Sequence, residues 1–450
     1  MVFADLFFLY AFLPAFALCY LLASLAEGNR VKNAVLVVFS LIFYAWGEPV
    51  YVFLLIFCAL LNWLIGLGVG RKGRGKTFWL IVGLVLDLAI LGIFKYLGRF
   101  PLPIGISFYT FQSISYLIDV YRGESPAQKR FGGLLLYIAM FPQLIAGPIV
   151  RYGTIAREIH QRKVTARDFA DGSFRFLVGL GKKVILANQL SEVSDLFLAG
   201  SLTDLTTAGA WVGLLAFSLQ IYFDFSGYSD MAIGIGRCLG FHFRENFEHP
   251  YCCNSITDFW RRWHISLGSF FRDYLYIPLG GNRRHQFFNI LVVWALTGIW
   301  HGASWNFMIW GLYFGLIVAL EKYTILRWKV PAWLLHAYSL LLVVLGWGIF
   351  YFVDFSRMAE FFPLLFGKAE AFTDFTVRSA ILSRFWLWIA AIVCCLPLGR
   401  WISRLFGDGK RAFGYDVLML GKLALSLALL AVCTCLLVGA TNNPFIYTRF

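Results

Sequence analysis

Charged residues are scarce in this chain. Asp, Glu, Lys and Arg make up 14% of its 450 residues, whereas 60% are hydrophobic and 18% are aromatic. A water-soluble domain needs a much larger share of charge to cover its surface, so this composition excludes one. It indicates instead a helical protein that crosses the membrane several times.

Several motifs of metal-dependent and serine-dependent enzymes are also missing. The chain has no HExxH motif and no GxSxG motif, and its nine cysteines include no pair of CxxC units. These absences argue against hydrolysis by zinc or by a serine triad, and we expect neither a bound metal nor a bound cofactor. The cysteines are expected to pack as small apolar side chains.

Apolar runs near the length needed to cross about 30 Å of hydrocarbon recur along the whole chain. We expect membrane-spanning segments at residues 4–26, 31–46, 50–70, 77–98, 104–121, 173–198, 209–236, 287–320 in broken form, 331–353, 382–398 and 413–440. No internal repeat or low-complexity linker separates them. The sequence therefore predicts one all-α membrane domain, residues 1–450, with about ten to twelve transmembrane helices.

Topology explains the net charge of +14 better than nucleic-acid binding does. Lys and Arg gather in alternate loops between the apolar runs, at residues 30–32, 71–76, 122–130, 322–329 and 400–411. Because cytoplasmic loops are enriched in Lys and Arg, we place these loops in the cytoplasm and both termini outside it. The prediction is a multi-pass protein of the cell membrane, in contact with the lipid bilayer and with no nucleic-acid partner.

Residues 131–150 interrupt this pattern. The stretch is apolar but contains Pro142 and Pro148, and it lies between two basic loops, which favours a re-entrant segment. The loop that follows, residues 151–167, is strongly basic. Either the positive-inside bias or a phosphate-rich ligand from the cytosol explains its charge. The candidates for phosphate contacts are Arg151, Arg157 and Lys163.

The stretch from Asp258 to Asp273 is predicted to form a short amphipathic helix and not a span. Large apolar side chains recur there at helical spacing, at Phe259, Trp263, Leu267 and Phe270. His264 lies within this stretch. A histidine beside a tryptophan is as consistent with structural support at the interface as with a direct part in catalysis, and both interpretations stay open.

His301 lies between Trp300 and Gly302 in an apolar segment. A lone histidine in a helix is more often a packed core residue than a catalyst. However, an ionisable ring at membrane depth is costly, and such residues usually serve a function. Imidazole is also well suited to proton transfer near neutral pH. The least demanding chemistry is one base that activates the hydroxyl of a partner molecule for attack on an activated acyl donor.

Long sequence blocks carry a family resemblance. They are FPQLIAGPIVR (141–151), LQIYFDFSGYSDMAIGIGRCLGF (219–241), ENFEHPY (245–251), DFWRRWHISLGSFFRDYLYIPLGGNR (258–283), TGIWHGASWNFMIWG (297–311) and NNPFIYTRF (442–450). Together they resemble the membrane-bound O-acyltransferases. The similar branch is the bacterial one, which contains the alginate O-acetyltransferases and the related peptidoglycan and D-alanyl transfer proteins. The signature core spans about residues 141–321.

This resemblance implies a polytopic helical fold with re-entrant and short amphipathic helices around a central funnel or tunnel. It matches His301 to the family's catalytic histidine and His264 to the second histidine. Other signature residues are expected to form the framework and the substrate tunnel. They are Asp224, Tyr228, Asn246, Asp258, Trp260, Arg261, Arg262 and Trp300.

The reaction implied is O-acylation. Acetyl-CoA or another acyl thioester would be the cytosolic donor, and His301 would take the proton of an acceptor hydroxyl that enters from the opposite face. His264 would orient a donor or stabilise the oxyanion. In this branch the acceptor is often the serine of an SGNH-type extracytoplasmic transferase, which passes the acyl group to a polysaccharide. A transporter, or a non-catalytic scaffold for a partner acyltransferase, is the alternative.

Overall fold

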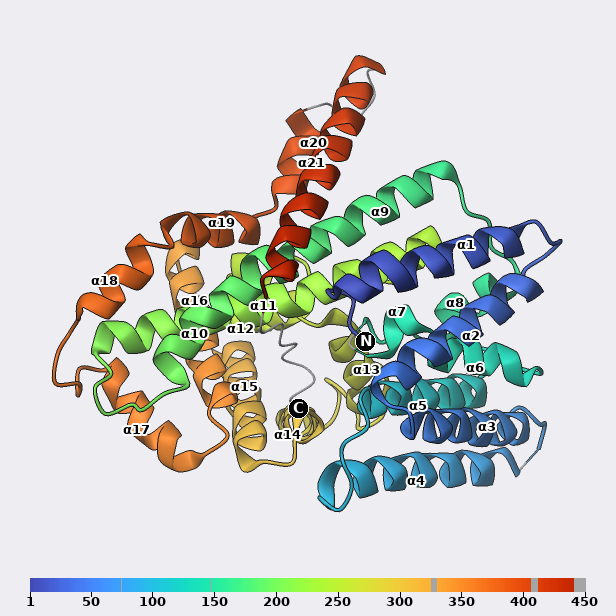
Figure 1. The fold of residues 1–450 in the computed structure, drawn as a ribbon. Coiled ribbons are helices and arrows are strands. Elements are labelled where there is room, and N and C mark those ends of the chain that lie inside the picture. The colour runs from blue at the N-terminus through green and yellow to red at the C-terminus, as the bar shows by residue number, and fades with distance from the viewer. Residues whose placement is uncertain (74, 146, 325–329, 406–411, 441–450) are drawn as a thin grey trace. The chain divides into compact units, whose positions relative to one another are not determined.

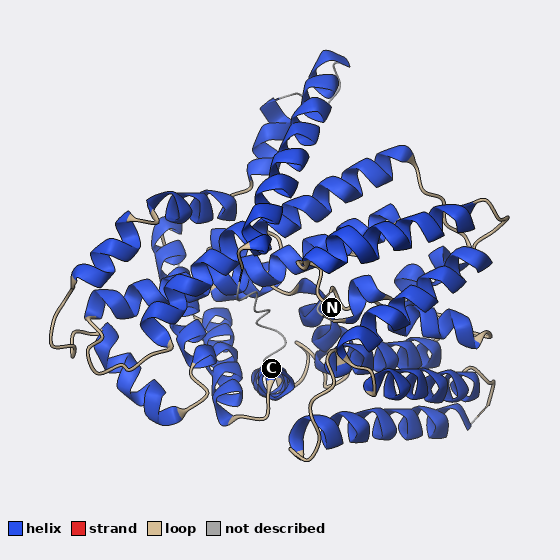
Figure 2. Ribbon diagram, in the orientation of Figure 1, coloured by secondary structure: helices blue, strands red, loops and turns tan. Residues whose placement is uncertain are grey.

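All secondary structure in the described part of the chain is helical. The computed structural model describes residues 1–450 except 74, 146, 325–329, 406–411 and 441–450, and the residues it describes form no strand (Figure 2). The predicted all-α class is therefore confirmed. The block NNPFIYTRF, at 442–450, lies outside the described residues.

The chain divides into two compact units. The first comprises Met1–Gly179 and Tyr228–Glu245, and the second comprises Leu180–Gly227 and Asn246–Phe450. The division falls within the long helix α11 (Thr207–Cys238), so it follows no linker in the sequence. Each unit has its own buried aromatic core.

The first unit contains the amino-terminal helices (Figure 1). They are the π-helical turn η1 (Phe8–Phe12), α1 (Leu13–Ser24), α2 (Arg30–Gly47), α3 (Tyr51–Val69), α4 (Gly75–Tyr96), α5 (Ile106–Arg122), α6 (Phe131–Ala139), α7 (Phe141–Leu144), α8 (Tyr152–His160) and most of α9 (Ala166–Gly181). Phe3, Phe43 and Phe141 are fully buried at its centre. The predicted break in residues 131–150 is present, because Met140 separates α6 from α7 in non-helical backbone. Residues 134–145 are all buried, as irregular backbone at membrane depth requires.

The second unit contains most of the remaining helices. They are η2 (Lys182–Ala187), α10 (Asn188–Leu198), the first part of α11, η3 (Pro250–Cys252), α12 (Ile256–Arg262), α13 (Ile265–Phe271), η4 (Arg272–Tyr276), α14 (Gln286–His301), α15 (Trp305–Tyr323), α16 (Ala332–Tyr351), α17 (Phe355–Leu365), α18 (Phe375–Leu382), α19 (Phe385–Cys395), α20 (Leu398–Leu405) and α21 (Ala412–Val438). The predicted break within 287–320 falls between α14 and α15, at residues 302–304.

Six described helices are long and apolar enough to cross a membrane, fewer than the ten to twelve spans expected. They lie at Arg30–Gly47, Tyr51–Val69, Gly75–Tyr96, Thr207–Cys238, Ala332–Tyr351 and Val417–Val438, and the pair α18 and α19, bent by 62°, could form a seventh. The difference arises because other apolar runs are divided into short helices. The run at 287–320, for example, is divided between α14 and α15 by the break at residues 302–304.

Close packing of α14 against α15 positions the end of α14. A Cβ atom at Gly298 would overlap the carbonyl oxygen of Phe307, and one at Gly311 would overlap the carbonyl oxygen of Trp294. The two backbones therefore touch, which only glycine allows at these two places. His301 is the last residue of α14, one turn beyond Gly298, so this contact fixes its position.

Candidate active site

A cavity of about 200 Å³ in the second unit brings the two predicted histidines together. It lies among α12, α13, η4 and α14, and most of its lining is apolar. The lining residues are Trp260, Trp263, His264, Leu267, Gly268, Phe271, Arg272, Tyr276, Ile290, Val293, Trp294, Thr297 and His301. An apolar cavity with a few convergent polar groups is the usual form of a small-ligand site.

Aromatic rings hold the side chain of His301 in place. His301 is 6% exposed. The rings of Trp310 and Phe350 meet its imidazole edge to face, with centroids at 5.1 Å and 5.4 Å, and the Trp300 ring lies at 4.9 Å. This packing fixes the plane of the imidazole without adding a charge beside it.

His264 lies at a break between two short helices. The stretch predicted as one amphipathic helix is in fact two, because α12 ends at Arg262 and α13 begins at Ile265. That prediction was wrong because it relied on apolar periodicity, which continues through the break. His264 has a φ of 44°, a left-handed conformation that side chains other than glycine seldom adopt.

Asn246 stabilises this break. Its side-chain oxygen Oδ1 accepts hydrogen bonds from the Ser266 backbone N–H at 3.2 Å and from the Ser266 hydroxyl at 2.8 Å. The same oxygen lies 3.1 Å from Nδ1 of His264. The backbone carbonyl of Asn246 also accepts from the N–H of Ile265 at 2.9 Å. One buried asparagine thus holds the first turn of α13 and the histidine before it.

These contacts define which nitrogen of His264 carries its proton. A backbone N–H can only donate, so the Asn246 atom that faces Ser266 must be the amide oxygen. Because that oxygen can only accept, Nδ1 of His264 must be the donor, and Nε2 keeps the lone pair in the neutral ring. Burial lowers the pKa of His264, which lies outside the candidate spans, to about 3. The ring is therefore neutral near pH 7.

Glu321 supports the site and is absent from the residues predicted from the sequence. It is fully buried on α15, and its carboxylate accepts from the backbone N–H groups of Ile256 and Thr257 at 2.6 Å and 2.8 Å and from the Thr257 hydroxyl at 2.7 Å. It therefore fixes the start of α12, the helix that carries Trp260. The sequence does contain an indication of this role. Glu321 is a lone carboxylate near the end of the apolar run 305–323, and a carboxylate in such a run requires a hydrogen-bonding partner.

The other predicted framework residues have separate environments. Trp260 lines the cavity, and the Trp300 ring lies 6.2 Å from the His264 ring and 4.9 Å from that of His301. Asp258 forms an ion pair with Arg262 at 3.0 Å along α12, whereas Arg261 is exposed.

Two further framework residues come from α11. Asp224 forms a buried ion pair at 2.6 Å with Lys183 of η2, inside the second unit. Tyr228 belongs to the first unit, where its ring stacks on Phe3 with centroids 4.6 Å apart. Neither lines the cavity that contains the histidines.

The three candidates for phosphate contacts belong to the first unit. Arg151 precedes α8, Arg157 is exposed on it, and Lys163 is exposed just after it. The basic loop also contains Arg162, which is buried and has a structural role. Its guanidinium lies 4.5 Å from the Phe241 ring centroid and donates to the carbonyl of Leu239 at 3.0 Å.

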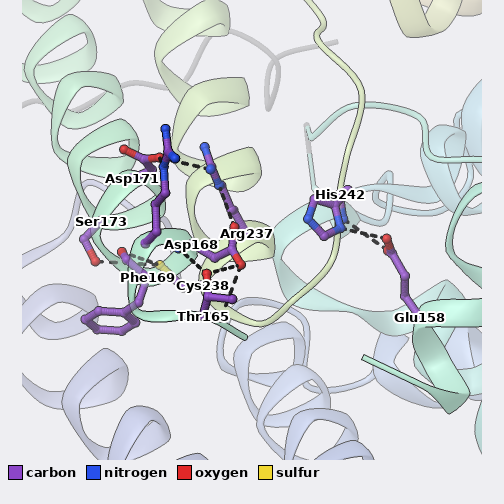
Figure 3. A network of polar contacts seen from close by, with 10 residues as sticks. Glu158, Thr165, Asp168, Phe169, Asp171, Ser173, Arg237, Cys238 and His242 are labelled. Carbon is purple, nitrogen blue, oxygen red and sulfur yellow. Dashed lines mark hydrogen bonds and ion pairs between the residues drawn. The ribbon is translucent and has the colours of Figure 1, made fainter. Parts of the chain in front are cut away.

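Polar contacts tie the end of α8 to the segment after α11, and the start of α9 to the end of α11 (Figure 3). His242 lies 2.8 Å from the carboxylate of Glu158, and Arg237 pairs with Asp171 at 3.0 Å and with Asp168 at 3.4 Å. Arg167 of the basic loop also pairs with Asp171, at 3.8 Å, so this network balances the charge of one basic loop residue. In the described part of the chain, no three His, Cys, Asp or Glu side chains cluster as metal ligands.

One short match to a nucleotide-binding pattern has the wrong context. Residues 70–77 fit GxxxxGK[ST], the spacing of a phosphate-binding loop. The pattern begins just after α3 and its last three residues are the first three of α4; both are apolar helices, whereas a phosphate-binding loop follows a strand. The Lys76 ammonium lies 4.6 Å from the Tyr121 ring centroid, and the Thr77 hydroxyl is 3.2 Å from the hydroxyl of the same tyrosine. We therefore assign no nucleotide site here.

Comparisons with known proteins show which family the chain resembles. Residues 130–332 match the model of the MBOAT, membrane-bound O-acyltransferase family. A probable alginate O-acetylase of Pseudomonas putida is 43% identical over 402 residues, covering 82% of this chain and 81% of the relative. The probable alginate O-acetylase of Pseudomonas aeruginosa is 43% identical over 387 residues, covering 78% and 72%. A peptidoglycan O-acetyltransferase of Helicobacter pylori is 36% identical over 386 residues, covering 73% of each chain.

Proposed function

This chain belongs to the membrane-bound O-acyltransferase family, and we propose that it moves an acetyl group from a cytosolic thioester, such as acetyl-CoA, to a hydroxyl on the other side of the membrane. Membership makes the chain an acyltransferase and a multi-pass membrane protein, which argues against a transporter or a scaffold. Its relatives are named for alginate and peptidoglycan, so we propose a surface or exported polysaccharide as the final acceptor.

The observation that carries this proposal is the apolar cavity with a histidine at each of two helix ends. An acyl group is apolar apart from its carbonyl, and most of the cavity wall is apolar or aromatic. The His301 ring supplies a nitrogen that can take a proton, and the neutral His264 ring supplies one that can accept a hydrogen bond. Such a site favours attack by a hydroxyl on an activated carbonyl and needs no metal.

We assign the general base to His301. Its imidazole takes the proton of the acceptor hydroxyl while the hydroxyl oxygen forms a bond to the thioester carbonyl carbon. The carbon–sulfur bond then breaks, and the leaving thiolate takes the proton from the imidazolium, which restores the neutral ring. A base positioned in this way contributes about 10²–10⁴-fold to the rate.

The tautomer of His264 suits orientation of the hydroxyl better than stabilisation of an oxyanion. Nδ1–H is engaged by Asn246, and Nε2 of a neutral ring can only accept. A nitrogen of this kind binds an O–H group but repels a developing negative charge. We therefore propose that Nε2 of His264 accepts from the acceptor hydroxyl as it enters the cavity and so places its oxygen, and that the hydroxyl then turns its one proton to His301 for transfer. This revises the oxyanion role considered from the sequence.

The remaining parts of the proposal concern the two faces of the membrane. The donor would approach from the cytosol, where Arg151, Arg157 and Lys163 would contact its phosphates. The immediate acceptor would be the serine of an SGNH-type transferase outside the cytoplasm, and both termini of this chain would lie on that side. The positive-inside distribution of its basic loops supports this orientation.

Replacement of His301 tests the assignment of the base. Cells that depend on this protein should lose the base-labile acetyl groups of their exported polysaccharide with His301→Ala, and the purified variant in proteoliposomes should no longer consume acetyl-CoA. We expect a loss of about 10²–10⁴-fold at an unchanged protein yield. His285→Asn is the matched control, because His285 lies outside the cavity and its φ of 48° suits asparagine.

Two outcomes would overturn the proposal. Full acetylation by a stable His301→Ala protein would remove His301 from the chemistry and favour a scaffold. A purified wild-type protein that moves a solute across proteoliposomes but never consumes acetyl-CoA, with or without acceptor, would favour a transporter.

A further inference from the structure

A second, larger cavity lies in the first unit, at the start of α2. It measures about 820 Å³ and is bounded by the loop before α2, one side of α2, the start of α6 and the end of α8. Its lining includes Glu27, Arg30, Ala34, Val37, Val38, Arg130 and Gly132. The proposed reaction gives this groove no role, and the family resemblance described above assigns it none.

One wall of the groove faces the region where lipid chains lie. Ala34, Val37 and Val38 come from α2, one of the helices long and apolar enough to cross the membrane. Val38 is 53% exposed, which at membrane depth means contact with hydrocarbon. The groove is therefore continuous with the lipid-facing side of α2.

The polar end of the groove has an excess of positive charge. Arg30 and Arg130 both line it and are exposed, and neither forms an ion pair with any described residue. Glu27 is the single carboxylate in the lining, so the arginines outnumber it. Guanidinium groups bind phosphate oxygens in pairs, and two of them near the membrane surface attract an anionic headgroup.

Hydrogen bonds hold the groove in shape without a ligand. The side-chain amide of Asn29 donates to the carbonyl of His160 at 3.1 Å, and that of Asn33 donates to the carbonyl of Ile159 at 2.8 Å. Arg162 in turn donates to the amide oxygen of Asn33 at 2.6 Å. The start of α2 is thereby fixed to the end of α8, which forms a preorganised site.

We propose that this groove binds one anionic phospholipid. Its phosphodiester lies between Arg30 and Arg130, and one acyl chain runs along Ala34, Val37 and Val38. Phosphate could also come from the thioester donor, but a donor headgroup has no apolar chain to place on the wall of α2. The continuous apolar wall therefore favours a lipid.

Lipid retention by the purified full-length protein tests this proposal. The protein is delipidated, incubated in mixed micelles with phosphatidylglycerol or phosphatidylcholine, and examined by native mass spectrometry. We expect one phosphatidylglycerol to remain bound under conditions that remove phosphatidylcholine. The double variant Arg30→Gln, Arg130→Gln should bind phosphatidylglycerol roughly 30-fold more weakly, since each arginine near the surface accounts for about a fivefold effect.

Two matched variants separate charge from shape. Arg71→Gln removes an exposed arginine that does not line the groove and should leave binding unchanged. Gly132→Leu should fill the groove and abolish retention, because a Cβ atom at Gly132 meets no atom within 4 Å and the position lies inside helix α6. It also serves where the double arginine variant fails to fold.

The results that would overturn the proposal are specific. Equal retention of the two lipids would show that the arginines do not select a phosphodiester anion. Equal loss in Arg71→Gln would show an effect of net charge alone. Displacement of phosphatidylglycerol by coenzyme A at matching concentrations would assign the groove to the phosphates of the donor. Because the readout is binding and not acetyl transfer, each result is independent of the proposed reaction.

Discussion

Asn246→Ala should keep His264 in the protein but remove the group that orients its ring, so it tests whether that orientation matters for turnover. The substitution removes one oxygen that accepts from Nδ1 of His264, from the Ser266 N–H and from the Ser266 hydroxyl. Each buried donor left without an acceptor costs about 1–3 kcal/mol, so we expect a folded but less stable protein. Without its acceptor, the His264 ring can turn or move its proton to Nε2, where it can no longer accept from a hydroxyl. If His264 aligns that hydroxyl, kcat should fall by about 10²–10⁴-fold.

The assay is acetyl-CoA consumption with an acceptor in proteoliposomes, corrected for folded protein. The donor KM should change by less than about threefold, because Asn246 contacts the histidine and not the donor. Asn246→Asp should restore most of the turnover, since a carboxylate also accepts from Nδ1. Asn62→Ala is the control, because it removes an equally buried amide from the first unit. Wild-type kcat in a folded Asn246→Ala protein would refute the positioning role of Asn246.

Two further predictions concern the helix that carries His301 and the donor. Gly298→Ala should lower the stability by about 1–3 kcal/mol and the turnover by about 10–100-fold, because the new methyl group meets the backbone of α15 and moves the end of α14. Gly92→Ala is the control, because a Cβ atom at Gly92 meets no other atom, and it should change neither stability nor turnover. Thermal denaturation and turnover assays measure both variants, and equal effects in the two would contradict the prediction. The double variant Arg151→Gln, Arg157→Gln should raise the donor KM more than it lowers kcat. An unchanged KM with lost turnover would place the donor elsewhere.

Local patterns in the sequence account for much of the fold. The all-α class and the multi-pass character follow from composition and from apolar runs, because both report how much surface must avoid water. The breaks at 131–150 and 287–320 were predicted as well, since Pro142 and Gly302 disfavour a continuous helix in any tertiary fold. His264 and His301 were selected because an ionisable ring in an apolar region is costly wherever its partners lie.

Contacts between residues far apart in the sequence decided the rest. The break at His264 depends on the Asn246 amide, and the start of α12 depends on the Glu321 carboxylate, and no local periodicity reports either partner. Asp224 and Tyr228 lie one turn apart on α11 yet belong to different units, because each side chain packs against its own neighbours. The sequence alone determined which residue types this membrane protein could use for chemistry. Only the tertiary structure decided which of them share a cavity. The hydrogen bond from His264 to Asn246 and the close approach of α14 to α15 form only when segments distant in the sequence meet.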